Sequence, residues 1–224
     1  MKAELLPCIE INPTTPPRTT IIWLHGLGAD GHDFEPIAEQ LALPPVLGVR
    51  FVFPHAPHRS VTINGGFVMR AWYDIASPDL TRGVDESGIV DSRQAIEGLI
   101  RRERRTGIDP SRVIVAGFSQ GGVIALETAA RFPERLGGVI ALSAYLPSPA
   151  EFPRARESLP VFMGHGTQDP VIPYHLGMQS RTELEGKGYS VEWHSYPMPH
   201  SVCWEEIGDL RNWLSEQLEP AAVD

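Results

Sequence analysis

Residues 113–126 read VIVAGFSQGGVIAL. The first four are apolar and mostly β-branched, which predicts a buried strand, and the residues after Gly122 favour a helix. Between them, Gly117 and Gly121 bracket Ser119 in a G-x-S-x-G pattern. Glycines at these positions let the strand and the helix approach closely around a strained turn. The pattern therefore predicts that this turn presents the Ser119 hydroxyl at the edge of a sheet.

Strands and helices alternate through the rest of the chain. Short β-branched runs predict strands at residues 20–24, 49–53, 112–116, 138–142, 161–163 and 191–196. Apolar residues at helical spacing predict helices at residues 33–41, 87–105, 120–131, 174–186 and 202–217. Several strands are apolar on both faces, as in a sheet covered by helices. This alternation predicts an α/β fold with a mostly parallel sheet, and a length of 224 residues fits a single domain over 1–224.

Residues 54–86 form a connection too long for a simple turn between a strand and a helix. Within it, residues 60–64 and 67–73 could pair as a hairpin across Asn64-Gly65, a favoured turn dipeptide. Such excursions are often functional, so we interpret this one as a lid-like insertion beside the active site. A purely structural flap is the alternative.

Composition and charge exclude several classes of protein. A net charge of −9 argues against binding to a phosphate backbone, and the basic cluster Arg101, Arg102, Arg104 and Arg105 suits the end of a helix. No apolar run approaches the ~20 residues that span a bilayer, and the first residues do not resemble a signal peptide. The two cysteines, Cys8 and Cys203, lack metal-ligand spacing and suggest reduced thiols, with a disulfide between them as the alternative. We therefore expect a cytoplasmic protein without a transmembrane segment.

A serine hydroxyl needs a neighbouring base before it can attack a carbonyl group. In folds with this elbow the chain order is serine, acid, histidine, which favours the histidines that follow Ser119. His200 is the predicted base, because its loop lies between the last strand and the last helix and so reaches the edge where the elbow lies. His194 lies within a predicted strand. His165 ends a strand but precedes every plausible acid.

The acid should orient the histidine and stabilise its protonated form. Asp169 follows the strand at 161–163 in a loop rich in glycine and proline, which suits the carboxyl end of the sheet. An aspartate that merely initiates a turn is the alternative. Asp209 is a weaker candidate because it follows His200 and lies inside a predicted helix.

Attack on a carbonyl creates a negative oxygen that needs two hydrogen-bond donors, an oxyanion hole. The first is the main-chain amide of Gln120, directly after the serine and at the start of a helix. The second should come from the loop after the first strand, where three glycines at 26, 28 and 31 could expose amides, and Leu27 is the predicted donor. A simple glycine-rich turn is the alternative. His25 is expected to shape this loop.

Taken together, these segments resemble the bacterial carboxylesterase and acyl-protein thioesterase family, also called the phospholipase/carboxylesterase group of α/β-hydrolases. The resemblance spans nearly the whole chain and rests on residues 24–30, 54–57, 61–66, 71–74, 117–122, 164–173 and 200–202. It implies a compact esterase with a small lid, with Leu27 and Gln120 at the oxyanion positions and no cofactor or metal. By the same resemblance Trp72 and Val171 line the acyl pocket, with an ordinary core position as the alternative for either. Pro199 departs from the family pattern, which commonly has glycine there.

We therefore expect a serine carboxylesterase that cleaves small acyl esters through an acyl-enzyme on Ser119, with thioesters and lysophospholipids as further substrate classes. A thioesterase that removes fatty acyl groups from protein cysteines is the alternative within the same chemistry. A binding protein that keeps the fold without catalysis is the alternative from another class, because a fold does not guarantee a function. A homodimer is expected by resemblance alone.

Overall fold

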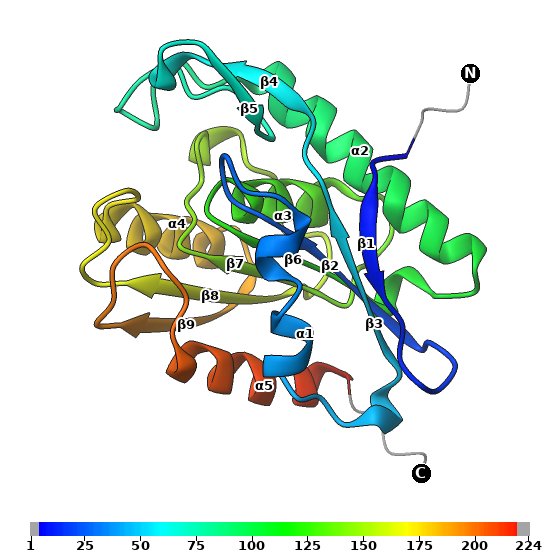
Figure 1. Ribbon diagram of the computed structural model, residues 1–224. Helices are drawn as coiled ribbons and strands as arrows, with labels where there is room; N and C mark the ends of the chain where they lie inside the picture. Colours follow the sequence, from blue (N-terminus) through cyan, green and yellow to red (C-terminus); the bar gives the residue numbers. More distant parts are fainter. Residues whose placement is uncertain (1–4, 219–224) are drawn as a thin grey trace.

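A seven-stranded sheet runs through the centre of the molecule in the computed structural model, which describes residues 5–218 (Figure 1). The strand order is β1-β3-β2-β6-β7-β8-β9, and only β1 runs antiparallel to its neighbour. The strands are β1 (Cys8–Ile11), β2 (Thr19–Leu24), β3 (Val49–Pro54), β6 (Val113–Phe118), β7 (Gly138–Leu142), β8 (Pro160–Gly166) and β9 (Ser190–Tyr196). The parallel strands place the loops after β2, β6 and β8 at one edge of the sheet.

Helices cover both faces of the sheet (Figure 1). Helices α2 (Glu86–Arg105), α3 (Gln120–Arg131) and α4 (Tyr174–Gly186) enclose one apolar core, which includes Ile96, Val123 and Leu184. Helices α1 (Ile37–Gln40) and α5 (Trp204–Leu218) enclose the other. Short 3-10 turns occur at Gly31–Phe34, Pro45–Leu47, Thr62–Asn64, Pro110–Arg112 and Pro149–Glu151. This architecture is the α/β-hydrolase fold expected from the sequence.

Most predicted elements are confirmed, with ends that shift by a few residues. The predicted helix at 33–41 is wrong in extent, because the chain forms a 3-10 turn over Gly31–Phe34 and then the four-residue α1. Pro36 lies at the break, where it has no N–H to donate to an earlier carbonyl oxygen. Strand β1 was missed because it is short and only half-buried. The basic cluster does end a helix, α2.

The elbow has the geometry that its glycines allow. Strand β6 ends at Phe118, α3 begins at Gln120, and Ser119 between them has φ 55° and ψ −120°. A Cβ at position 121 would overlap the carbonyl oxygen of Leu24, and one at position 117 would overlap the backbone of Gly121. Only glycine fits at either position, so the close approach of strand and helix holds Ser119 in its strained conformation.

Residues 54–86 include the predicted hairpin, formed by β4 (His58–Val61) and β5 (Phe67–Arg70). The connection is longer than a two-residue turn, because a 3-10 turn over Thr62–Asn64 is followed by two glycines with positive φ. The hairpin is tied to the main domain. The carboxylate of Asp74 accepts hydrogen bonds from the Thr62 amide and hydroxyl, and the Asp74 amide donates to Asp85, which caps α2.

Candidate active site

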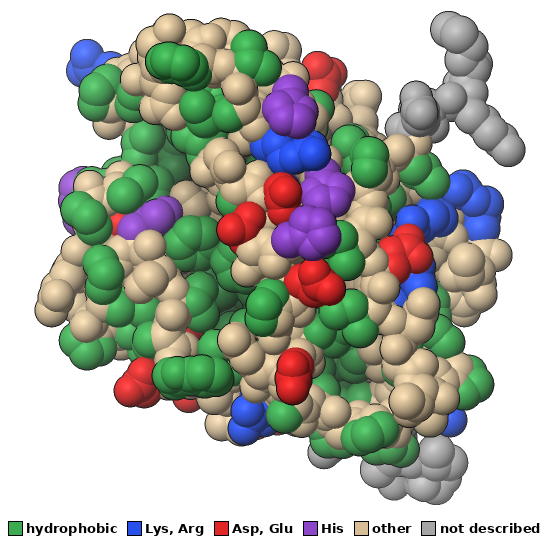
Figure 2. All heavy atoms as spheres, viewed as in Figure 1, with side chains coloured by type: hydrophobic (Ala, Val, Ile, Leu, Met, Phe, Trp, Pro, Cys, Tyr) green, Lys and Arg blue, Asp and Glu red, His purple; other side chains and the backbone are tan. Residues whose placement is uncertain are grey.

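Ser119 lies at the carboxyl edge of the sheet, on the wall of a cavity of about 570 Å³. Leu27, Val171 and His200 line the same cavity, and each comes from a loop that follows a different strand. In Figure 2 the surface is hollowed below the β4–β5 hairpin, and hydrophobic side chains line the depression. The elbow, the loop after β2 and the loops after β8 and β9 therefore meet at one opening.

His200 and Asp169 form a hydrogen-bonded pair beside Ser119. The imidazole Nδ1 of His200 donates to the Oδ2 carboxylate oxygen of Asp169 at 2.7 Å. The ring also packs against Phe118, the residue before Ser119, with ring centroids 4.6 Å apart. Its other nitrogen, Nε2, is thus left for a group in the cavity. The unusual Pro199 does not prevent His200 from reaching Asp169.

The Asp169 carboxylate is held on both of its oxygens. While Oδ2 accepts from His200, Oδ1 accepts from the main-chain amides of Val171 and Ile172, at 2.8 and 2.9 Å. The side chain is fully buried. Three donors fix the direction of the carboxylate, so Asp169 is both a turn-former and a partner of His200.

None of the competing residues from the sequence lines the cavity, although His165 Nε2 lies 3.6 Å from Asp169 Oδ2. His194 contacts Asp209 at 3.2 Å and Glu192 at 2.8 Å, and neither His194 nor Asp209 lines the cavity. His165 is fully buried, and its Nε2 donates to the carbonyl oxygen of Ile172 at 2.9 Å. Burial lowers the pKa of His165, which favours the neutral ring.

The two predicted oxyanion donors are amides without an acceptor. Among residues 5–218, no hydrogen bond uses the main-chain N–H of Leu27 or of Gln120. The amides of Gly28 and Gly122 are occupied, since Gly28 donates to the carbonyl oxygen of Arg70 and Gly122 to that of Ser119. A free amide on each side of the serine is the arrangement that a developing oxyanion requires.

The two predicted pocket residues have different positions. Val171 is half exposed and lines the cavity. Trp72 is fully buried and is absent from the cavity wall. Its indole N–H donates to the carbonyl oxygen of His25 at 2.8 Å, and its main-chain N–H donates to the side chain of Gln120 at 2.7 Å.

The apolar wall of the cavity was missed from the sequence. It comes from the segment 31–40 and from the start of α5, with a contribution from the elbow itself. The side chains are Phe34, Ile37, Phe118, Val202 and Ile207. No local pattern indicated this wall, because apolar residues that face a cavity have the same spacing as those that face a core.

His25 is neutral and bonded through both ring nitrogens. Its Nε2 accepts from the amide of Ala56 at 3.0 Å, and its Nδ1 lies 2.7 Å from the carbonyl oxygen of Gly26. These partners place the ring proton on Nδ1. Burial lowers the pKa of His25, because the protonated ring would be poorly solvated. The ring shapes the loop, as the sequence predicted.

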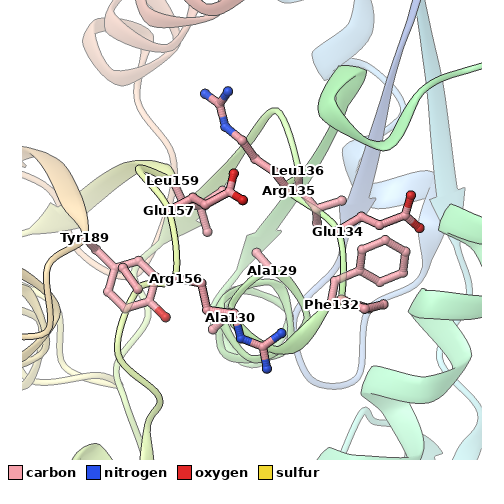
Figure 3. Close-up of a pocket in the computed structure, with 12 residues that line it drawn as sticks. Ala129, Ala130, Phe132, Glu134, Arg135, Leu136, Arg156, Glu157, Leu159 and Tyr189 are labelled. Carbon is pink, nitrogen blue, oxygen red and sulfur yellow. The ribbon is translucent and has the colours of Figure 1, made fainter.

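A second, smaller cavity lies away from this site. Figure 3 shows this cavity of about 60 Å³, which is lined by residues preceding β7, β8 and β9, such as Leu136, Leu159 and Tyr189, and therefore lies at the amino ends of the strands. Charged Arg135, Glu134, Arg156 and Glu157 surround it in balanced number. Within residues 5–218, no three His, Cys, Asp or Glu side chains are grouped to hold a metal ion, and no helix is long and apolar enough to cross a membrane.

The covered parallel sheet, the serine elbow and the paired histidine and aspartate define an α/β-hydrolase. Comparison with known proteins narrows the class. Residues 7–218 match the model of the phospholipase/carboxylesterase family, and the chain belongs to this family. It is a hydrolase that acts on carboxylic esters or thioesters.

Two named relatives resemble the chain over most of its length. Acyl-protein thioesterase 1 of Neurospora crassa is 39% identical over 216 residues, which cover 91% of this chain and 88% of that protein. The carboxylesterase SOBER1 of Arabidopsis thaliana is 32% identical and covers 90% of this chain and 92% of that protein. The crystal structure of SOBER1 superposes with a TM-score of 0.83. The resemblance is therefore not confined to bacterial proteins.

Proposed function

We propose that this protein is a serine carboxylesterase that cleaves acyl esters with Ser119 as nucleophile, His200 as base and Asp169 as orienting acid. The observation that carries the proposal is the 2.7 Å hydrogen bond from His200 to Asp169 at the mouth of a cavity that Ser119 also lines. A strained serine and an oriented imidazole that line one cavity suit nucleophilic attack on a carbonyl carbon.

The mechanism proceeds in two halves. Ser119 Oγ attacks the carbonyl carbon while its proton passes to His200 Nε2, and the resulting oxyanion accepts hydrogen bonds from the amides of Leu27 and Gln120. The tetrahedral intermediate then collapses, and the leaving alcohol or thiol takes the proton from His200. A water molecule next loses a proton to His200 and attacks the acyl-enzyme, which releases the acid and restores Ser119. Asp169 stabilises the protonated His200 in both halves.

The lining of the cavity favours substrates whose acyl group is apolar. The cavity has a volume of about 570 Å³, and Phe34, Ile37, Val202 and Ile207 make much of its wall apolar. Asp33 and Gln40 add polar atoms to the wall, and no described lining residue is a lysine or an arginine. Neutral acyl esters of short to medium chain therefore fit better than anionic ones.

The second candidate function is the removal of fatty acyl groups from protein cysteines, and one observation favours it. The Neurospora crassa relative is named an acyl-protein thioesterase. Rates on matched oxygen and sulfur esters of the same acid, followed by rates on an S-acylated peptide, separate the two candidates. A rate on the peptide that exceeds the small-ester rate would favour the thioesterase.

The test of the proposal is the Ser119→Ala variant. We expect its turnover of p-nitrophenyl esters to fall by several orders of magnitude, while its circular dichroism stays that of the wild type, because the change removes one oxygen. A fluorophosphonate probe should label the wild type and not the variant. Equal hydrolysis by both proteins would reject Ser119 as nucleophile.

We also propose that the protein is cytoplasmic and forms a homodimer. The free thiols of Cys8 and Cys203 suit a reducing compartment, which supports a cytoplasmic location. Cell fractionation tests the location. The proposed homodimer is tested by light scattering after size-exclusion chromatography, where a monomer mass at micromolar concentration would reject it.

A further inference from the structure

Trp72 is connected to both sides of the predicted oxyanion hole. Its main-chain N–H donates to Gln120 Oε1 at 2.7 Å, and Gln120 Nε2 donates to the carbonyl oxygen of Tyr73 at 2.7 Å. Two hydrogen bonds thus join the Gln120 side chain to the backbone at 72–73. Gln120 is the same residue whose main-chain amide is the first proposed oxyanion donor.

The indole of Trp72 reaches the other side. Its Nε1 donates to the carbonyl oxygen of His25 at 2.8 Å, and its ring lies against the His25 ring with centroids 5.2 Å apart. His25 in turn donates from Nδ1 to the carbonyl oxygen of Gly26 at 2.7 Å. The bonds fix two successive peptide planes, 25–26 and 26–27.

The fixed plane of the 26–27 peptide sets the direction of the Leu27 N–H. A trans peptide is planar, so its C=O and N–H point in opposite directions. When His25 holds the Gly26 carbonyl on one side, the Leu27 N–H of the same peptide is aimed at the other side. This backbone lies against the nucleophile, since a Cβ at position 26 would be 3.6 Å from the Cβ of Ser119.

We propose that Trp72 is a positioning residue of the oxyanion hole, which fixes the spacing and direction of the Leu27 and Gln120 amides through its indole N–H and its main-chain N–H. The inference rests on the proposed function of these two amides. It replaces the role in the acyl pocket that the sequence suggested for Trp72 with an indirect role in transition-state stabilisation.

The burial of the Trp72 connections makes the arrangement rigid. Trp72, His25 and Gln120 are each 2% exposed or less, so water cannot replace a lost donor easily. Ser92 also donates through its hydroxyl to the Trp72 carbonyl, and this anchors the backbone to α2. Preorganised donors need no reorganisation when charge develops, which is the main source of oxyanion stabilisation.

The experiment uses Trp72→Phe in the full-length protein. Phenylalanine keeps an aromatic ring against His25 but removes the indole N–H. We expect kcat for p-nitrophenyl butyrate to fall by at least about tenfold, with KM changed by less than about threefold. The loss in kcat should be smaller than the roughly 10²–10³ that removal of an entire oxyanion donor costs, because both amides are still present. Affinity for an alkyl trifluoromethyl ketone, which forms a tetrahedral adduct with the serine, should fall by the same factor as kcat/KM.

Trp23→Phe is the matched control. Trp23 is also fully buried, and its indole nitrogen has no hydrogen-bond partner among the described residues. The same substitution there removes similar volume but no hydrogen bond. We expect kcat of this control to stay within about twofold of the wild type. An equal loss of kcat in both variants, or an unchanged kcat in folded Trp72→Phe, would overturn the inference.

Gln120→Leu provides the second measurement and decides the question if Trp72→Phe does not fold. The variant loses both side-chain hydrogen bonds to residues 72–73, so we expect the same pattern of lower kcat, unchanged KM and weaker binding of the ketone. An unaltered kcat in this variant would overturn the inference. If both single variants fold, the double variant should lose less than the product of the two single losses. Labelling of wild-type Ser119 by a fluorophosphonate is checked first. Absence of labelling rejects the proposed function itself, whereas labelling with an unaffected Trp72→Phe rejects only the positioning role.

Discussion

Asp169→Asn tests the proposed triad at its most constrained member. In the wild type, Oδ1 accepts two main-chain amides and Oδ2 accepts His200 Nδ1–H. An asparagine has one oxygen and one NH₂ group. If the NH₂ group faced the amides of Val171 and Ile172, both donors would lose their acceptor, and the buried Ile172 amide alone would cost about 1–3 kcal/mol. The oxygen therefore stays with the amides, and the NH₂ group faces His200.

This orientation reverses the roles on the imidazole. His200 Nδ1 must accept a hydrogen bond from the introduced NH₂ group, so the ring proton moves to Nε2, and Nε2 can no longer accept the proton of Ser119. The equivalent change in a serine protease lowers kcat by about 10⁴, or about 5 kcal/mol. We expect a loss of the same order here, with little change in KM and in the far-ultraviolet circular dichroism.

The assay is hydrolysis of p-nitrophenyl butyrate near neutral pH, together with the rate of labelling by a fluorophosphonate. Asp209→Asn is the matched control, because Asp209 also contacts a histidine, His194 at 3.2 Å, but lies outside the cavity. The control should keep its activity. A loss below about tenfold in folded Asp169→Asn would refute the tautomer argument and the role of Asp169 with it.

Three further predictions concern packing, protonation and substrate size. In Gly121→Ala the new Cβ overlaps the backbone carbonyl oxygens of Leu24 and His25, so the free energy of unfolding, measured by thermal unfolding, should fall by at least about 1–3 kcal/mol. Gly208→Ala in α5 is the control and should not lower the free energy of unfolding, because a Cβ there meets no atom within 4 Å. Burial raises the pKa of Glu206 from 4.5 to about 8, with the charge of Asp209 adding to the effect. The folded protein therefore keeps a proton that the unfolded chain has lost, and the stability of the wild type relative to Glu206→Gln should fall by about 3–4 kcal/mol as pH rises from about 5 to about 8. Denaturant titrations at several pH values measure this, and a constant difference between the two proteins would reject it. Val202→Phe fills part of the cavity, so kcat/KM for an octanoate ester should fall at least about tenfold relative to an acetate ester, since each excluded CH₂ is worth about 0.8 kcal/mol. Val46→Phe, on an exposed surface, should leave the ratio unchanged.

The elbow could be predicted from sequence because its determinants are local. Four apolar residues before Gly117 and a glycine at 121 specify the strand, the turn and the start of the helix within about ten residues. The pairing of His200 with Asp169 followed from the topology, since loops at one edge of a parallel sheet lie near each other. Both inferences needed only the order of elements along the chain.

The functions of buried side chains could not be predicted in this way. Trp72 has the burial and size of a pocket residue, and its actual partners, His25 and Gln120, are 47 and 48 positions away. Apolar Ile37 and Ile207 have ordinary core spacing, yet they face a cavity. Which way a buried side chain points depends on packing between distant segments, and no local pattern encodes that packing.

The short helix α1 and the 3-10 turn before it form one wall of the proposed acyl cavity, whereas the proposed amide donors belong to the loop after β2 and to the start of α3. Most of the apolar wall is thus encoded apart from the proposed reacting residues, with Phe118 of the elbow as the exception. Diversification confined to residues 31–40 and 202–207 can alter which acids are released without touching the reacting atoms. Libraries restricted to these codons are a practical starting point for engineering new ester specificity on this scaffold.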